Sequence, residues 1–185
     1  RSEYVLILAG DHLYRMDYEK MAEFHWEHDA DITVAVQPVP ANEASRFGIL
    51  KVDEAGCITN FAEKPKDPEL LASLVSRDDP VSPYLGSMGI YFFKTDVLID
   101  LLNKDRSLER LDDFGGDIIP FAINEGMNVC GYSFEGYWRD IGTIRTFYEA
   151  NLELAEDKPS FNFFDQSKPI YTHARFLPGT RTHTC

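Results

Sequence analysis

The chain has 185 residues, of which 44% are hydrophobic and 26% charged, as in globular domains with a core of their own. A formal net charge of −13 argues against nonspecific binding to nucleic acids or anionic membranes, which requires a basic surface. No apolar run approaches the roughly 18 residues of a membrane span, and no signal-like leader occurs.

The first predicted element is a buried strand in the apolar run from Tyr4 to Ala9, which stops at Gly10. Asp17 is then expected to cap a helix. The residues that share one face of this helix are Met21, Phe24, His25 and His28. The β-branched segment DITVAVQPV, which starts at Asp31, predicts the next strand.

The middle of the chain predicts a hairpin, an excursion and a further strand. GILKVD and CITNFAEKP form the hairpin around the turn residues Glu54, Ala55 and Gly56. Residues 66–83, rich in Pro and Asp, predict a loop with one helical turn, and SMGIYFF (87–93) predicts a strand.

The last third predicts three helices, one strand and one loop. Thr95 is expected to cap a helix, and a second helix is expected to run from about Gly116 to Gly126. MNVCGYSF predicts a strand, YWRDIGT a loop, and Thr143 the cap of a long helix. The inward residues of the first helix are expected to be Val97, Leu98, Leu101 and Leu102. One face of the last helix carries Ile144, Phe147, Asn151, Leu152 and Ala155.

Strands that alternate with helices predict an α/β sheet covered on both sides, with an antiparallel hairpin set into it. Ligands in such sheets bind outside the carboxyl ends of the strands. Asp11 follows the first strand directly, and Asp140 lies in the loop before the last helix. Two carboxylates at one sheet edge would suit Mg²⁺, although either could instead cap a turn or helix, and Asp140 could pair with Arg139.

Three weaker candidates lie at other strand ends. Lys64, before Pro65, is placed to meet a phosphate, and Glu63 to accept sugar hydroxyls or orient the lysine. The same Glu-Lys-Pro is also typical of a solvated strand end. Ser87 lies between two glycines and offers a hydroxyl contact; Leu85 stands where a nucleophile elbow needs glycine.

The histidines and cysteines favour structural roles. His25 and His28 share a helical face without an evident third ligand, which favours core or interface histidines over zinc. Cys57, Cys130 and Cys185 lack metal-like spacing and are typical of a reduced cytosolic protein.

Seven segments occur in a specific order: GDHLYRMDY, EASRFGIL, FAEKPK, GSMGIYFF, DFGGDIIP, GYWRDIGT and FYEANLELA. Together they resemble the bacterial and plant glucose-1-phosphate adenylyltransferases, also called ADP-glucose pyrophosphorylases. The resemblance runs from Tyr4 to about Pro178. It implies a Rossmann-like mixed sheet of the nucleotide-diphospho-sugar transferase type, here incomplete.

The resemblance also implies an activity and a site. ATP and α-D-glucose 1-phosphate would give ADP-glucose and pyrophosphate in glycogen or starch synthesis. Asp11 and Asp140 would be catalytic ligands of Mg²⁺, and Lys64 would be catalytic and hold the sugar phosphate. Gly48, Glu63 and Ser87 would line the glucose pocket. A homo- or hetero-tetramer, allosteric control, and a place in the cytoplasm, or in the plastid of a plant, are implied as well.

Departures from the family set the expected domain organisation. The family's N-terminal glycine-rich nucleotide loop and its C-terminal left-handed β-helix are not found in this sequence. We therefore expect residues 1–157 to be the C-terminal part of a catalytic domain, 158–185 to lead toward a β-helix domain, and this piece to be inactive alone. Two alternatives stay open: another sugar-1-phosphate nucleotidyltransferase, or a noncatalytic regulatory subunit that binds sugar phosphate.

Overall fold

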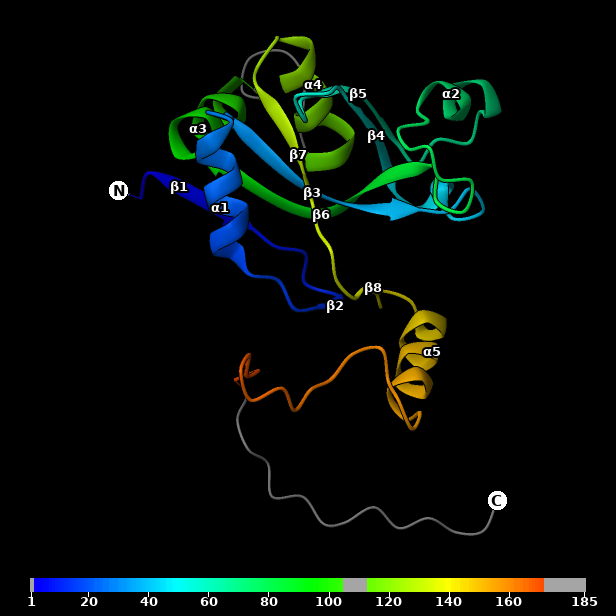
Figure 1. Ribbon diagram of the computed structural model, residues 1–185. Helices are drawn as coiled ribbons and strands as arrows, with labels where there is room; N and C mark the ends of the chain where they lie inside the picture. Colours follow the sequence, from blue (N-terminus) through cyan, green and yellow to red (C-terminus); the bar gives the residue numbers. More distant parts are fainter. Residues whose placement is uncertain (1, 105–112, 172–185) are drawn as a thin grey trace. The chain divides into compact units, whose positions relative to one another are not determined.

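The computed structural model describes residues 2–104 and 113–171 (Figure 1). The chain divides into two compact units, Arg1–Asp140 and Ile141–Cys185. From residue 172 on, the expected connecting segment, Cys185 included, lies outside the described residues.

The first unit carries strands and helices in the predicted alternation. Its strands within the described residues are β1 (Tyr4–Ile7), β2 (His12–Tyr14), β3 (Ile32–Val39), β4 (Gly48–Val52), β5 (Ile58–Glu63), β6 (Tyr84–Lys94), β7 (Val129–Ser133) and β8 (Trp138–Asp140). Its helices are α1 (Tyr18–Glu27), the 3₁₀ helix η1 (Ala44–Arg46), α2 (Pro68–Ser73), α3 (Thr95–Lys104), the π-helical turn η2 (Phe114–Ile118) and α4 (Ile119–Asn124).

The main sheet is built around β6. The strand order is β5-β4-β6-β3-β7, with β1 added to the second half of β6. β6 is antiparallel to β3, β4 and β1, whereas β3 and β7 are parallel, so the predicted mixed sheet is confirmed. β1 is half-buried rather than buried, because its ladder is with β6 alone.

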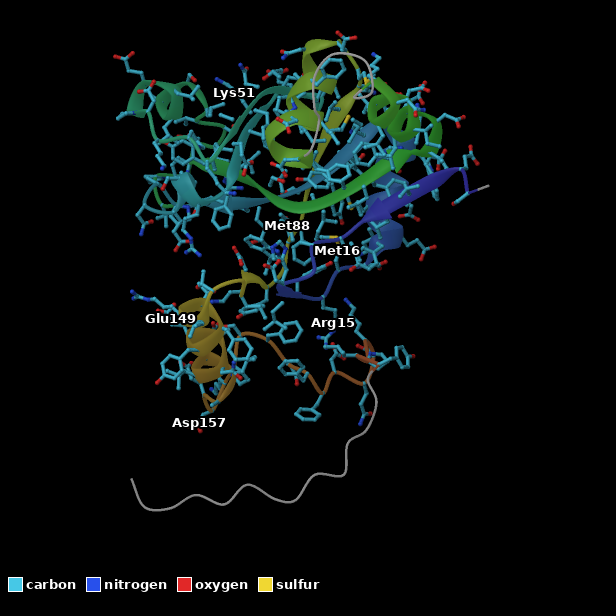
Figure 2. The ribbon with its side chains drawn as sticks, turned by 180° about the vertical axis from the view of Figure 1, so that it is seen from behind. Arg15, Met16, Lys51, Met88, Glu149 and Asp157 are labelled. Atoms are coloured by element: carbon cyan, nitrogen blue, oxygen red, sulfur yellow. The ribbon has the colours of Figure 1, made fainter. Side chains whose placement is uncertain are left out.

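Alternating side chains of the sheet supply two apolar clusters on its two faces. Ile32, Val34 and Val36 of β3 pack with residues of α3, η2 and α4, while Ala35 faces α1. Figure 1 shows these helices on the two sides of the sheet. Figure 2 labels Met16 and Met88, which belong to the α1 side. The prediction of helices on both faces is confirmed.

Most helix starts follow the predicted caps, and α3 does not. The Asp17 carboxylate accepts a hydrogen bond from the Glu19 amide at 3.2 Å, as expected for α1. α3 instead includes Thr95 as its first residue, and the buried Thr95 hydroxyl has no hydrogen-bond partner among the described residues. Leu102 was expected to face inward but is 43% exposed, because Leu98 and Leu101 form the buried stripe.

Two strand predictions need correction. β6 begins at Tyr84, three residues before the expected start at Ser87, because Leu85 and Gly86 pair with β3 and β4. YWRDIGT is not wholly a loop. Trp138–Asp140 forms β8, which pairs antiparallel with β2 in a separate two-stranded ribbon.

The second unit contains α5 (Ile144–Leu154). The Thr143 hydroxyl accepts a hydrogen bond from the Thr146 amide at 3.1 Å, which confirms the predicted cap. The expected apolar face is largely exposed, with Ile144 at 91%, whereas Thr146 and Ala150 are buried. No helix in residues 2–104 or 113–171 has the length and apolarity needed to cross a bilayer.

Candidate active site

The β2–β8 ribbon brings together the two predicted metal ligands. His12 lies directly opposite Asp140, and Asp11 immediately precedes His12. Cα atoms of opposite residues in an antiparallel pair are about 4.5–5.5 Å apart. The register therefore places the backbones of Asp11 and Asp140 on neighbouring rungs, although the two residues are distant in sequence.

His12 connects the two strands of the ribbon through its ring. The Trp138 indole donates to His12 Nδ1 at 3.3 Å, and the two rings meet edge to face with centroids 5.1 Å apart. With Nδ1 as the acceptor, the neutral imidazole carries its proton on Nε2. His12 Nε2 lies 3.6 Å from Asp11 Oδ1. The imidazole thus faces the carboxylate, whose side chain is still 61% exposed.

A cavity of about 210 Å³ lies between the ribbon and the β4, β5 and β6 strands. It is lined by His12, Arg46, Phe47, Gly48, Glu63, Lys64, Ser87, Met88, Gly89, Tyr91, Asp113, Gly115, Trp138 and Asp140. Five of the six predicted site residues are in this set, and Asp11 adjoins it next to His12. The cavity combines carboxylates with two cationic side chains, which suits a ligand with hydroxyl groups and a phosphate.

The Glu63 carboxylate fits between two glycines. Gly48 is its cross-strand partner, and a Cβ there would lie 2.8 Å from Glu63 Oε2. A Cβ on Gly115 would also lie 2.8 Å from that oxygen. A Cβ at either glycine would therefore make the Glu63 carboxylate shift, and one at Gly48 would also meet the Phe61 ring at 2.5 Å.

Lys64 has an unusual backbone. Its φ is 44°, in the left-handed region that disfavours a side chain, although Pro65 follows it. The Lys64 amide donates to the Phe47 carbonyl at 3.1 Å, and the ammonium lies 3.1 Å from Glu63 Oε1. The side chain is 63% exposed, so it remains accessible to a ligand. Such strain is concentrated at functional sites.

A β-bulge shapes the floor of the cavity at Ser87 and Gly89. The pairing of β6 with β3 shifts between Tyr91 and Ser87, and Gly89 has a φ of 66°. Ser87 Oγ accepts from the Gly89 amide at 3.2 Å and is hydrogen-bonded to Tyr91. Burial raises the pKa of Tyr91 to about 12, despite the Ser87 bond, so its hydroxyl stays protonated at neutral pH.

Comparison with known proteins identifies the family of this chain. The nucleotidyl transferase family profile matches residues 1–157. The chain belongs to the nucleotidyl transferase family. It is also 48% identical, over an aligned length of 185 residues, to the chloroplastic/amyloplastic glucose-1-phosphate adenylyltransferase small subunit of Triticum aestivum. That alignment covers 95% of this chain and 39% of the wheat protein, so the chain spans about two fifths of its relative's length.

Six polar or aromatic lining residues of this nucleotidyl transferase were not predicted: His12, Arg46, Phe47, Tyr91, Asp113 and Trp138. His12 and Trp138 adjoin the predicted aspartates, and this proximity was the available signal. In the sequence, Tyr91 has the pattern of a core strand residue and Asp113 that of a helix cap. Asp113 does cap the helix, because its carboxylate accepts a hydrogen bond from the Gly116 amide at 2.7 Å.

The donor set of this nucleotidyl transferase site suits Mg²⁺. The described residues contain no group of three or more His, Cys, Asp or Glu arranged to hold a metal ion. Mg²⁺ does not need one, because it is usually bound by one or two carboxylates together with substrate phosphates and water. The exposed Asp11 carboxylate, and Asp140 one backbone rung away, supply the one or two carboxylates that this requires.

His25 and His28 lie elsewhere in the first unit. His25 is buried, and its Nδ1 is 2.8 Å from the Thr33 hydroxyl. His28 Nδ1 is 2.8 Å from the Phe24 carbonyl, and its ring stacks on Phe24. The prediction of a core role is thus confirmed for His25.

Proposed function

We propose that this chain forms the sugar-phosphate side of the active site of a glucose-1-phosphate adenylyltransferase. The reaction transfers AMP from ATP to α-D-glucose 1-phosphate and releases pyrophosphate. The observation that carries the proposal is the pairing of β2 with β8, which sets the backbone of Asp11 one rung from Asp140, together with a cavity that Asp140, Gly48, Glu63, Lys64 and Ser87 line. The wheat relative supports the choice of substrates.

In this proposal the protein mainly positions the reactants and balances their charge. The phosphate oxygen of glucose 1-phosphate attacks the α-phosphorus of ATP in line, and pyrophosphate leaves on the opposite side. Lys64 holds and neutralises the sugar phosphate, and its ion pair with Glu63 fixes the ammonium. Bound to Asp11 and Asp140, Mg²⁺ would supply positive charge at the reacting phosphates.

Glu63, Ser87 and Tyr91 would recognise the sugar. Glu63 offers carboxylate oxygens to sugar hydroxyls, and the protonated Tyr91 hydroxyl, bonded to Ser87, offers a donor. The missing side chain of Gly48 lets the sugar approach the backbone. The hexose would thus be oriented by side chains of β5 and β6.

The proposal extends to the whole protein. Residues 1–157 would belong to the catalytic domain and 158–185 would lead toward a β-helix domain in a homo- or hetero-tetramer under allosteric control. A plastid location would follow if the protein comes from a plant, as the wheat relative does, and a cytoplasmic one otherwise.

The test is pyrophosphate release from ATP and glucose 1-phosphate with Mg²⁺. It uses this chain and a version extended at the N-terminus by the nucleotide loop of the family. We expect turnover in the extended protein only, and glucose 1-phosphate binding by both. ATP should be preferred over CTP, GTP, UTP and dTTP.

Each other outcome favours a specific alternative. Turnover with another nucleotide would indicate a different sugar-1-phosphate nucleotidyltransferase. Sugar-phosphate binding by a folded extended protein without turnover would indicate a noncatalytic subunit. No binding of glucose 1-phosphate to either protein would contradict the proposed site.

A further inference from the structure

Two cysteines face each other where the two ends of the main sheet meet. The strand order runs from β5 at one end to β7 at the other. Cys57, just before β5, nevertheless forms an isolated antiparallel bridge with Cys130 of β7. The Gly131 amide donates to the Gly56 carbonyl at 2.9 Å, which flanks this bridge. The cysteine pair is therefore a single rung that links the turn of the β4–β5 hairpin to β7 at the other end of the strand order.

The backbone at this rung has the separation that a disulfide needs. A hydrogen bond between the flanking residues marks Cys57 and Cys130 as a non-hydrogen-bonded antiparallel pair, for which Cα atoms are about 4.5 Å apart. Disulfides form at Cα separations of about 4.4–6.8 Å. Both side chains also leave the ladder on the same face. A disulfide here requires only side-chain rotation.

The two thiols already converge on one atom. Cys57 Sγ lies 3.5 Å and Cys130 Sγ 3.4 Å from Asn128 Oδ1. The Asn128 amide nitrogen donates to the carbonyls of His28 and Asp29, which fixes the orientation of the side chain.

The two cysteines differ in accessibility. Cys57 is half-buried and Cys130 is fully buried. Burial, reinforced by the neighbouring Cys57, raises the pKa of Cys130 to about 12. Because the thiolate is the reactive form, Cys130 is a poor first nucleophile, and an oxidant from solution meets Cys57 first.

We propose that Cys57 and Cys130 are a redox modification site. A low-molecular-weight disulfide such as oxidised glutathione would oxidise them to a reversible intramolecular disulfide that joins the two cysteines. The Cys57 thiolate attacks one sulfur of the oxidant, and one glutathione thiolate leaves. Cys130 then gives up its proton and attacks Cys57 Sγ, which releases the second glutathione thiol. The protein pair loses two electrons and two protons, and the oxidant gains them.

The bond ties the tip of the β4–β5 hairpin to β7. The opposite end of that hairpin carries Gly48, Glu63 and Lys64, which line the cavity. Oxidation therefore adds a covalent link between β7 and the hairpin whose other end lines the cavity. Because the link spans a long stretch of chain, it should also restrict the unfolded state.

The test uses the complete chain, reduced and then exposed to oxidised glutathione under native conditions. After an acid quench, free thiols are alkylated with N-ethylmaleimide and mapped by mass spectrometry. All three cysteines should be alkylated before oxidation; afterwards Cys57 and Cys130 should be protected and recovered as one disulfide-linked peptide, whereas Cys185 should carry either N-ethylmaleimide or glutathione. Dithiothreitol should restore all three. The melting temperature should rise by about 5–10 °C on oxidation.

Variants and a denatured sample supply the controls. Cys130→Ser should accumulate the glutathione adduct on Cys57, and Cys185→Ser should still form the link. In urea, pairing should become random and include Cys185. Three alkylated thiols after native oxidation, a stable glutathione adduct on Cys57 of the unaltered chain, or linkage through Cys185 would each overturn the proposal.

Discussion

At the scale of single residues, the site depends on charges held in fixed places within a strongly acidic chain. Asp140 is fixed by its rung in the ribbon, and Lys64 by a backbone conformation that few residues adopt. The Glu63 carboxylate lies in the space that two glycines leave open and pairs with the Lys64 ammonium. Each of these residues should therefore have a distinct effect when it is replaced.

Replacing Asp140 tests the proposed metal site. Asp140→Asn keeps the size of the side chain and removes the charge that Mg²⁺ requires. We expect kcat in the N-terminally extended protein to fall by roughly two orders of magnitude or more with the fold intact. Steady-state kinetics and circular dichroism measure the two effects. Glu54→Gln, an exposed change in the hairpin turn, is the charge-matched control, and near-normal turnover in Asp140→Asn would remove that residue from the site.

Two substitutions at Lys64 distinguish the effect of its charge from the effect of its backbone conformation. Lys64→Ala should raise the KM for glucose 1-phosphate roughly 10–100-fold and change that for ATP little, because one charged hydrogen bond is lost. Lys64→Gly should have the same kinetic defect but be about 1 kcal/mol more stable than Lys64→Ala, since glycine adopts a φ of 44° without strain. Urea denaturation compares the two variants.

Lys66→Ala is the matched control, because this exposed lysine is two residues away and is not among the lining residues of the cavity. An effect of Lys64→Ala confined to ATP would contradict the sugar-phosphate assignment. Equal stability of the alanine and glycine variants would contradict the strain.

At the scale of elements, the ribbon is the feature that assembles the site. β2 and β8 contribute three residues each, and the Trp138–His12 hydrogen bond joins them. Residues that orient a metal ligand typically change metal affinity or activity 10–100-fold when they are replaced. In the proposed site, His12 would be such a positioning residue for Asp11.

His12→Ala should raise the Mg²⁺ concentration needed for half-maximal turnover of the extended protein by about 10–100-fold. The Asp11 carboxylate would lose its neighbour, and the Trp138 indole its acceptor. His28→Ala, which removes a histidine that stacks on Phe24 in the first unit, should leave the Mg²⁺ requirement unchanged. Equal Mg²⁺ titrations for both variants would rule out the positioning role.

Longer elements were predictable from the sequence and short ones were not. Apolar periodicity and caps such as Asp17 and Thr143 predicted α1 and α5, because the relevant interactions are local. β2 and β8 are too short to show alternation, and each exists only because the other pairs with it. Leu102 shows the same limit, since helical spacing alone does not reveal which edge of an apolar stripe faces the sheet.

The candidate site divides in the same way. Strand-end carboxylates and the family resemblance led to five residues of the cavity wall. Tyr91 and Asp113 were not predicted, because a strand tyrosine and a capping aspartate have common structural roles. Only the tertiary arrangement shows that they also face the cavity.

At the scale of the whole molecule, the fold of the first unit includes a buried titratable group. His25 lies against Tyr4 and Phe92 and is hydrogen-bonded to Thr33. Burial lowers the pKa of His25 to about 4, aided by Lys94 and opposed by Asp31 and Asp29. The folded state thus binds a proton there less readily than the unfolded state, whose histidine has a pKa of about 6.5.

This difference predicts a pH-dependent stability. The contribution of neutral His25 is fully present above about pH 6.5 and is lost as the pH falls toward 4, by at most about 1.4 kcal/mol per pH unit. Urea denaturation between pH 4 and 8 measures it. His25→Gln should show a shallower decline than the parent chain, and His28→Gln the same decline as the parent. A parallel decline in the parent and in His25→Gln would exclude His25 as the source.

The pairing of β2 with β8 also bears on how related sequences are aligned. The separation of Asp11 and Asp140 follows from the ribbon register and does not depend on the number of residues between Ser133 and Trp138. That connection can therefore change in length without a change of the ribbon register, provided that Phe134 keeps its buried place against β3. A gap there that spares Phe134 leaves the ribbon register intact, whereas a single-residue gap inside either ribbon strand would turn the side chains beyond it to the opposite face.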